Sequence, residues 1–121
     1  MDNMLLIAGL LTLLLSAVHS VVGERLVFAP LREGGQWSEA ALKLLALRRW
    51  LSIRATWHLV SILATGLAAL LLSQALGGPD AQLLMGGTFL VSTVYWAVAT
   101  RFGHPAWIIL GVIAALLLFP N

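Results

Sequence analysis

Four stretches without a charged residue divide this 121-residue chain and constrain what it can fold into. They cover residues 3–23, 55–79, 81–100 and 102–121, so each is at least 20 residues long. A helix rises about 1.5 Å per residue, and about 20 apolar residues cross a hydrocarbon core of about 30 Å. The sequence therefore predicts an all-α protein, a bundle of four transmembrane helices.

The composition fits that class and argues against a soluble domain. Hydrophobic residues make up 60% of the chain and charged residues only 10%, with a mean hydropathy of +0.97. Soluble domains carry about 25% charged residues. We expect a single integral membrane domain over residues 1–121, with no room for a separate catalytic domain. The net charge of +2 gives no reason to expect nucleic acid as a partner.

The basic residues predict the orientation of the helices. If four helices alternate in direction, all seven Lys and Arg residues fall on one side, while Asp2, Asp80 and both termini fall on the other. An excess of Lys and Arg marks the cytoplasmic loops. We therefore expect a multi-pass protein of the bacterial inner membrane with both termini on the non-cytoplasmic side. The predicted spans are roughly 4–23, 50–75, 82–100 and 104–119, with a cytoplasmic loop over 24–49.

The predicted loop contains signals that interrupt and restart helix formation. Pro30 and the pair Gly34-Gly35 break a helix, and Ser38 is a candidate N-cap. Residues 39–48 then interleave leucines with basic residues. Two interpretations stay open for this segment: a helix lying in the membrane interface, or an early start of the second span.

Polar residues inside the spans carry the functional signal, because lipid makes them costly unless they meet a partner. His19 lies five residues before Glu24, and His58 lies four residues after Arg54. Both imidazoles are thus expected about 6–8 Å below the same interface, at about 1.5 Å per residue. His104 enters the fourth span from that side. These positions predict a pocket at the cytoplasmic end, lined in addition by Ser16, Trp57, Ser61, Tyr95, Arg101 and Trp107.

Imidazoles from separate helices at one depth point to two kinds of cofactor. A divalent metal ion would use His19, His58 and His104, with Glu24 as an oxygen ligand. Haem would use His19 and His58 as axial ligands, with Arg54 near the propionates. Alternatively, the histidines hydrogen-bond within the protein and Arg54 pairs with Glu24, or the histidines relay protons. No helix carries two histidines at a metal-binding spacing that would select one interpretation.

All five tryptophans fall in the cytoplasmic half of the predicted topology. They are Trp37, Trp50, Trp57, Trp96 and Trp107. Such residues commonly form a belt at the membrane interface. The alternative is that a few line the mouth of a site for a flat or long-chain ligand.

Three classes of function follow from these observations. The first is a binding or redox module that holds haem or a metal ion. The second is a membrane enzyme or carrier that acts on a lipid headgroup or an isoprenoid. The third is a structural subunit of a homo-oligomer or of a larger membrane complex. Membrane lipid is the partner expected in each class, and the sequence leaves enzymatic activity open.

Two resemblances rest on short motifs. The strings His19-Ser20-Val21-Val22-Gly23-Glu24-Arg25 and Ala55-Thr56-Trp57-His58-Leu59-Val60 resemble those of small four-helix bacterial membrane proteins, which implies the fold but no activity. The turn Arg101-Phe102-Gly103-His104-Pro105 resembles the Arg-His-Pro turn of membrane isoprenylcysteine and phospholipid methyltransferases, which implies S-adenosylmethionine as cofactor. In that family arginine directly precedes histidine and a pair of acidic residues follows. Here Phe102 and Gly103 intervene, and no acidic residue follows Asp80.

Overall fold

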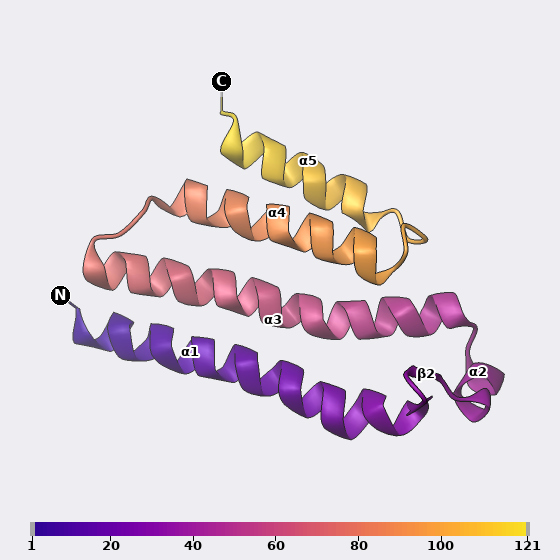
Figure 1. The fold of residues 1–121 in the computed structure, drawn as a ribbon. Helices are drawn as coiled ribbons and strands as arrows, with labels where there is room; N and C mark the ends of the chain where they lie inside the picture. The colour runs from indigo at the N-terminus through magenta and orange to yellow at the C-terminus, as the bar shows by residue number, and fades with distance from the viewer. Residues whose placement is uncertain (1, 121) are drawn as a thin grey trace.

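Four long helices lie side by side in chain order in the computed structural model, which describes residues 2–120 (Figure 1). Helix α1 covers Asn3–Val22, α3 Leu47–Leu76, α4 Ala81–Ala99 and α5 Ala106–Leu118. Helix α1 packs on α3, α3 on α4, and α4 on α5. The main interfaces thus join successive helices in a row, and α3 contacts both α1 and α4. The structure confirms the all-α class.

Acidic residues cap the two helices that begin at the N-terminal end of the molecule. The Asp2 carboxylate accepts hydrogen bonds from the backbone N–H groups of Met4 (3.0 Å) and Leu5 (3.2 Å). The Asp80 carboxylate accepts one from Gln82 (2.6 Å). A carboxylate at this position satisfies free N–H groups and complements the helix dipole. Both acidic residues are therefore explained by local structure.

The connection between α1 and α3 is folded rather than open. Beyond Val22 the chain continues as the π-helix η1 (Gly23–Phe28) and the 3₁₀ turn η2 (Ala29–Leu31). Strands β1 (Arg32–Glu33) and β2 (Gln36–Trp37) pair antiparallel around Gly34-Gly35, both of which have positive φ, as a tight two-residue turn requires. Ser38 then caps α2 (Glu39–Leu44), which ends before α3 begins. Residues 39–44 thus form a separate short helix.

Four aromatic residues hold this connection against the helices, and we call Phe28, Trp37, Trp50 and Trp57 the aromatic cluster. Phe28 is fully buried, with Trp37 and Trp57 both edge-on to its ring at 6.3 and 5.9 Å. Trp37 stacks on Trp50 at 5.2 Å, and the Trp50 indole donates to the Ala41 carbonyl at 2.8 Å. Three of the five tryptophans are therefore half-buried and pack against other aromatic rings at this end.

Small residues fill the helix interfaces, and large apolar residues face outward. The buried helical residues include Gly9, Ser16, Ala55, Ser61, Gly66, Ala68, Gly86, Ser92, Ala97 and Ala114. Leucine, isoleucine and valine side chains cover the outside of every long helix. This distribution is typical of membrane helices, where small residues allow close backbone approach and lipid solvates the large ones.

Three helical segments are long and apolar enough to cross a membrane: Asn3–Leu31, Leu47–Leu76 and Ala81–Ala99. The first two are longer than the predicted spans because η1 and η2 extend α1 and because α3 begins at Leu47. Helix α5 is apolar but has 13 residues, a length of about 20 Å at 1.5 Å per residue. Its crossing stays a prediction.

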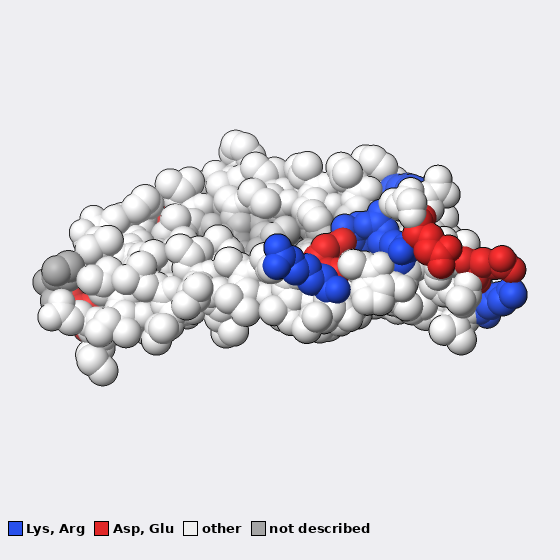
Figure 2. Space-filling model, turned by 60° about the horizontal axis from the view of Figure 1, so that its bottom comes forward, with Lys and Arg blue, Asp and Glu red and all other residues white. Residues whose placement is uncertain are grey.

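Charged side chains gather at one end of the molecule (Figure 2). All seven basic residues lie there, on η1, β1, α2, the first turns of α3 and the turn between α4 and α5. We call this the charged end. Glu24, Glu33 and Glu39 also lie there, which leaves it with a net charge of +4 from seven basic and three acidic residues.

Candidate functional site

Glu24 is the centre of an ionic cluster at the charged end. Its Oε2 accepts from Arg54 Nε at 3.0 Å and its Oε1 from Arg54 Nη2 at 2.7 Å, a two-pronged pair. The Glu24 carboxylate also lies 2.9 Å from His58 Nε2 and 3.6 Å from Arg32 Nη1. The predicted pairing of Arg54 with Glu24 is confirmed. Two guanidinium groups share one carboxylate, so the cluster keeps a net positive charge even when His58 is neutral.

The π-helix η1 positions Glu24 between α1 and α3. Such turns are rare and occur frequently at functional sites. They are wider than α-helical turns, so η1 changes which of its side chains point toward α3. At its start Gly23 lies directly against Trp57: a Cβ atom at Gly23 would fall 1.9 Å from Trp57 Nε1. Only glycine fits at this position, and the close approach brings the Glu24 carboxylate within reach of α3.

His58 links this cluster to a network of hydroxyl groups farther from the charged end, between α1 and α3. Its Nδ1 lies 2.9 Å from Ser20 Oγ, and Ser20 Oγ lies 2.6 Å from Ser61 Oγ. Farther along, Ser16 Oγ donates to the Ser61 carbonyl at 2.6 Å and lies 2.8 Å from Thr65 Oγ1. These bonds run between α1 and α3. Both ring nitrogens of His58 are therefore engaged, one by a hydroxyl and one by a carboxylate.

His19 has a different environment from His58. Its ring stacks on Trp57 at 4.7 Å with an interplanar angle of 6°. Its Nε2 lies 3.1 Å from the Trp57 carbonyl, and the Trp57 indole donates to the His19 carbonyl at 3.0 Å. A carbonyl only accepts, so Nε2 carries a proton in this bond. The side chains of His19 and Trp57 thus each bond the backbone carbonyl of the other residue, and these two bonds join α1 to α3.

His104, Arg101 and Trp107 lie away from this cluster, at the turn between α4 and α5. The His104 ring packs edge-on against Trp96 at 5.2 Å, and its Nδ1 accepts from the Ala106 N–H at 3.2 Å. Arg101 and Phe102 both have positive φ, and this sharp turn places Trp107 against Phe102. His104 borders a separate cavity rather than capping the site of His58.

Of the predicted metal ligands His19, His58, His104 and Glu24, the structure brings His58 and Glu24 together but directs His19 and His104 toward other partners. Within residues 2–120, no group of three or more His, Cys, Asp or Glu side chains is arranged to hold a metal ion. The physical reason is the direction of the rings: His58 faces Glu24, His19 faces Trp57, and His104 faces Trp96. Each of the three rings therefore contacts a different partner.

A groove runs along α3 from the ionic cluster toward the middle of the helix. It consists of three adjoining cavities of about 260, 390 and 330 Å³. The first and second share His58 and Tyr95, and the second and third share Ile62 and Thr65. The second is bounded by α1 through Ser16 and Ser20. The predicted lining residues Ser16, Ser61 and Tyr95 border this groove, whereas Trp57 faces α1.

Several residues of the site carry no signal that sequence reasoning used. Ser20 is the hydroxyl that contacts His58, Arg32 is the second guanidinium beside Glu24, and Phe28 is the buried ring next to His58 at 6.1 Å. Ser20 lies four residues after Ser16 in the first predicted span, so spacing alone could have placed both on one face of the helix. The positions of Arg32 and Phe28 depend on η1 and the hairpin, and no sequence motif predicts the geometry of these two elements.

No protein-family model, no curated protein and no solved structure matches this chain.

Proposed function

We propose that this protein binds an amphipathic membrane lipid in the groove along α3, with the headgroup at the ionic cluster. This is the lipid or isoprenoid class of function. The observation that carries it is the continuity of the groove. Its α3 lining residues are Leu51, Arg54, Ala55, His58, Ser61, Ile62, Thr65, Gly66 and Ala69. Their steps of three and four residues are those of one face of one helix.

The opposite wall of the groove follows the same rule. On α4 the lining residues are Leu84, Gly87, Thr88, Val91, Tyr95, Val98 and Ala99, again at steps of three and four. From Leu51 to Ala69 the groove extends about 27 Å at 1.5 Å per residue. A single long apolar chain fits this shape better than a compact or planar ligand does.

Polarity changes along the groove in the way an amphiphile requires. The end at the charged end contains Arg54, His58 and Tyr95, and the far end contains Ile62, Gly66, Ala69, Leu84 and Val91. Arg54 uses Nε and Nη2 for Glu24, which leaves Nη1 free of that pair. Within residues 2–120, no hydrogen bond joins the Tyr95 hydroxyl to another residue. These donors favour an anionic or strongly polar headgroup.

Haem and metal binding draw less support from the same geometry. Both nitrogens of His58 are engaged in hydrogen bonds, so axial ligation by His58 would break one of them, and Nε2 of His19 is engaged as well. The proposed orientation, with the charged end at the cytoplasmic face of a bacterial inner membrane, rests on the Lys and Arg excess there. In this orientation the headgroup of the bound lipid lies at the cytoplasmic leaflet.

The test fills the groove without disturbing the protein. A Cβ atom at Gly87 would meet no atom within 4 Å, so a leucine there projects into open groove. Wild-type protein and Gly87→Leu are purified in a mild detergent, and bound lipid is extracted and identified by mass spectrometry. Ala115→Leu, on an exposed position of α5, is the matched control.

We expect the wild type and Ala115→Leu to retain an amphiphile near one per protein. Gly87→Leu should retain about one-tenth of it, which corresponds to a loss of about 1.4 kcal/mol in binding. Equal retention by Gly87→Leu and wild type would refute the proposal. A Soret absorption band in the purified wild-type protein would instead select haem, and stoichiometric co-purifying proteins would select the structural-subunit class.

A further inference from the structure

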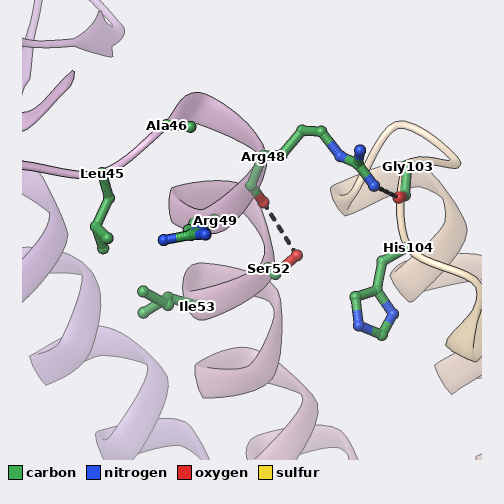
Figure 3. A pocket seen from close by; sticks show the side chains of 8 residues that line it. All are labelled: Leu45, Ala46, Arg48, Arg49, Ser52, Ile53, Gly103 and His104. Carbon is green, nitrogen blue, oxygen red and sulfur yellow. Dashed lines mark hydrogen bonds between the residues drawn. The ribbon is translucent and has the colours of Figure 1, made fainter.

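We infer that a second site at the charged end, separate from the groove, binds the phosphate ester of an anionic lipid headgroup. The site is a cavity of about 640 Å³ between the first turns of α3 and the turn from α4 to α5 (Figure 3). Its lining residues are Leu45, Ala46, Arg48, Arg49, Ser52, Ile53, Gly103 and His104. The volume lies in the range of about 300–1,000 Å³ that small-molecule sites occupy.

Three side chains around this cavity, those of Arg48, Arg49 and His104, provide hydrogen-bond donors. Arg48 donates through Nη2 to the Gly103 carbonyl at 2.5 Å, which holds its guanidinium across the cavity mouth and leaves Nε and Nη1 (Figure 3). The Arg49 guanidinium makes no hydrogen bond or ion pair with another residue of the range 2–120. Because His104 Nδ1 accepts from the Ala106 N–H, the neutral ring carries its proton on Nε2, a further donor.

The charge of the cavity differs from that of the ionic cluster. Two arginines line the cavity and none of its eight lining residues is acidic, whereas Glu24 offsets Arg54 in the cluster. Planar guanidinium groups bind phosphate oxygens with paired N–H groups. An anion is therefore the ligand that these residues select. A cation would meet uncompensated positive charge here.

The apolar wall and the depth of the cavity indicate a lipid as the source of the phosphate. Leu45, Ala46 and Ile53 form an apolar side, which a soluble phosphate would leave unused. Arg48 and Arg49 precede Arg54 by six and five residues, so they lie about 8–9 Å farther out along α3. That is the level of lipid headgroups when Arg54 lies at the edge of the hydrocarbon. Basic pockets between membrane helices bind anionic lipids in this manner.

The experiment measures lipid binding to the full chain in neutral detergent by native mass spectrometry. The probes are phosphatidylglycerol, phosphatidylcholine and soluble glycerol 3-phosphate. We expect the wild type to bind phosphatidylglycerol in preference to phosphatidylcholine. Arg49→Gln should weaken phosphatidylglycerol binding by about fivefold, the effect of about 1 kcal/mol per basic residue. The double variant Arg48→Gln/Arg49→Gln should weaken it further.

The control variants show whether phosphatidylglycerol binds in this cavity, to the general positive charge of the charged end, or in the groove. Arg25→Gln removes one exposed positive charge of the charged end outside the cavity, and it should change phosphatidylglycerol binding less than about twofold if the site is local. Gly87→Leu, which fills the groove, should leave the preference for phosphatidylglycerol intact. The two proposals can therefore fail independently. Arg49→Gln also keeps the test valid if loss of the Arg48–Gly103 bond unfolds the double variant.

Two outcomes would overturn the inference. One is wild-type affinity for phosphatidylglycerol in Arg49→Gln, and the other is an equal loss in Arg25→Gln and Arg49→Gln. Competition by glycerol 3-phosphate identifies the source of the phosphate ester. If it displaces phosphatidylglycerol at similar concentrations, the cavity takes the soluble ester and the lipid assignment is overturned. If it does not, the apolar wall contributes to binding and the lipid is the ligand.

Discussion

The two helix pairs at the edges of the row, α1–α3 and α4–α5, use similar residues in opposite ways. Between α1 and α3, Ser16 and Ser20 bond across the interface to α3. On α4, Thr88, Ser92 and Thr93 donate instead to carbonyls four residues earlier on their own helix, at 2.8 Å each. The α4–α5 contact is made mainly by glycine and apolar side chains, such as Gly86 against Leu118, with one exposed bond from Gln82 to the Leu117 carbonyl.

This difference shows what the fold requires and what it does not. Within residues 2–120, the pair α4–α5 has no buried ion pair and no interhelical hydroxyl network. Apart from the exposed Gln82–Leu117 bond, close packing of small and apolar residues joins these two helices. The charges and hydrogen bonds between α1 and α3 therefore go beyond what helix association needs. They lie beside the groove, and ionisable residues at such depth are expected to serve a ligand or a pathway.

The largest expected effect concerns the α4–α5 pair: a reporter fused to the C-terminus is either active or inactive, depending on whether α5 crosses the membrane. Gln82 Nε2 donates to the Leu117 carbonyl at 2.9 Å, so the end of α5 lies near the start of α4 and near Asp80. If α5 crosses as predicted, the chain leaves the membrane on the side of Asp80. A reporter enzyme that is active only in the periplasm, fused after Asn121, should then be active.

A matched fusion tests the opposite side. The same reporter inserted at Gly34-Gly35, in the hairpin turn at the charged end, should be inactive. An active hairpin fusion together with an inactive C-terminal fusion would reverse the orientation of all helices. Activity at neither position would mean that α5 returns to the cytoplasm without crossing. The α4–α5 pair would then be a re-entrant unit, and the comparison with α1–α3 would lose its basis.

A smaller effect is expected from the ionic cluster itself. Glu24→Gln keeps the shape of the side chain but leaves Arg54 and Arg32 without their shared counter-charge. Removing one partner of a fully buried ion pair costs about 3–5 kcal/mol, and since the Glu24 side chain is 33% exposed we expect about 2 kcal/mol. Unfolding in mixed detergent micelles, followed by circular dichroism, measures the change in the free energy of unfolding.

Glu39→Gln is the matched control for this substitution. Glu39 pairs with Lys43 at 3.1 Å on α2, but their side chains are 85% and 74% exposed. Exposed pairs of this kind contribute less than about 0.5 kcal/mol. If Glu24→Gln and Glu39→Gln change the free energy of unfolding equally, the cluster does not hold α1 to α3. The case for a site built around Glu24 would then rest on the groove alone.

Local chemistry made much of this architecture predictable. Hydropathy and charge belong to the sequence itself, so three long apolar helices and the Ser38 N-cap were accessible without a structure. The pairing of Arg54 with Glu24 followed from depth, because a buried charge needs a partner and one acidic residue lay at the matching level. In each case the position of a residue along the helix axis was sufficient for the prediction.

Rotation about the helix axis could not be predicted in the same way. His19 and Ser20 are adjacent, yet His19 faces Trp57 and Ser20 faces His58, because successive residues point about 100° apart. The wider turn of η1, which contains Glu24, changes the direction in which the side chains point again. Arg101 and Phe102 have positive φ, and the turn that they form directs His104 toward Trp96. Matched depth therefore predicted a common pocket for three histidines that face different partners.

The smallest expected effect tests the comparison of the two helix pairs most directly. Ser16 and Ser92 are both buried, at 4% and 0% exposure, and Ser→Ala removes the same atom from each. Ser16 bonds to Ser61 and Thr65 across the interface, whereas Ser92 bonds to Thr88 on its own helix. Hydrogen bonds between membrane helices contribute about 0.6 kcal/mol on average. We expect Ser16→Ala to lower the free energy of unfolding by about that amount and Ser92→Ala to leave it nearly unchanged.

Both changes in the free energy of unfolding are small, so the test is whether Ser16→Ala lowers it more than Ser92→Ala does. A hydroxyl bonded within its own helix competes with the backbone ladder and adds little to stability. A hydroxyl that bridges two helices is lost only when they separate, so its removal should appear in the unfolding transition. Adding Thr65→Val to Ser16→Ala completes a double-mutant cycle, and a coupling beyond about 0.3–0.5 kcal/mol would show that the two side chains act as one interhelical contact. Additive effects, with Ser92→Ala as costly as Ser16→Ala, would mean that the α1–α3 network is no more interhelical in its energetics than the self-bonded hydroxyls of α4.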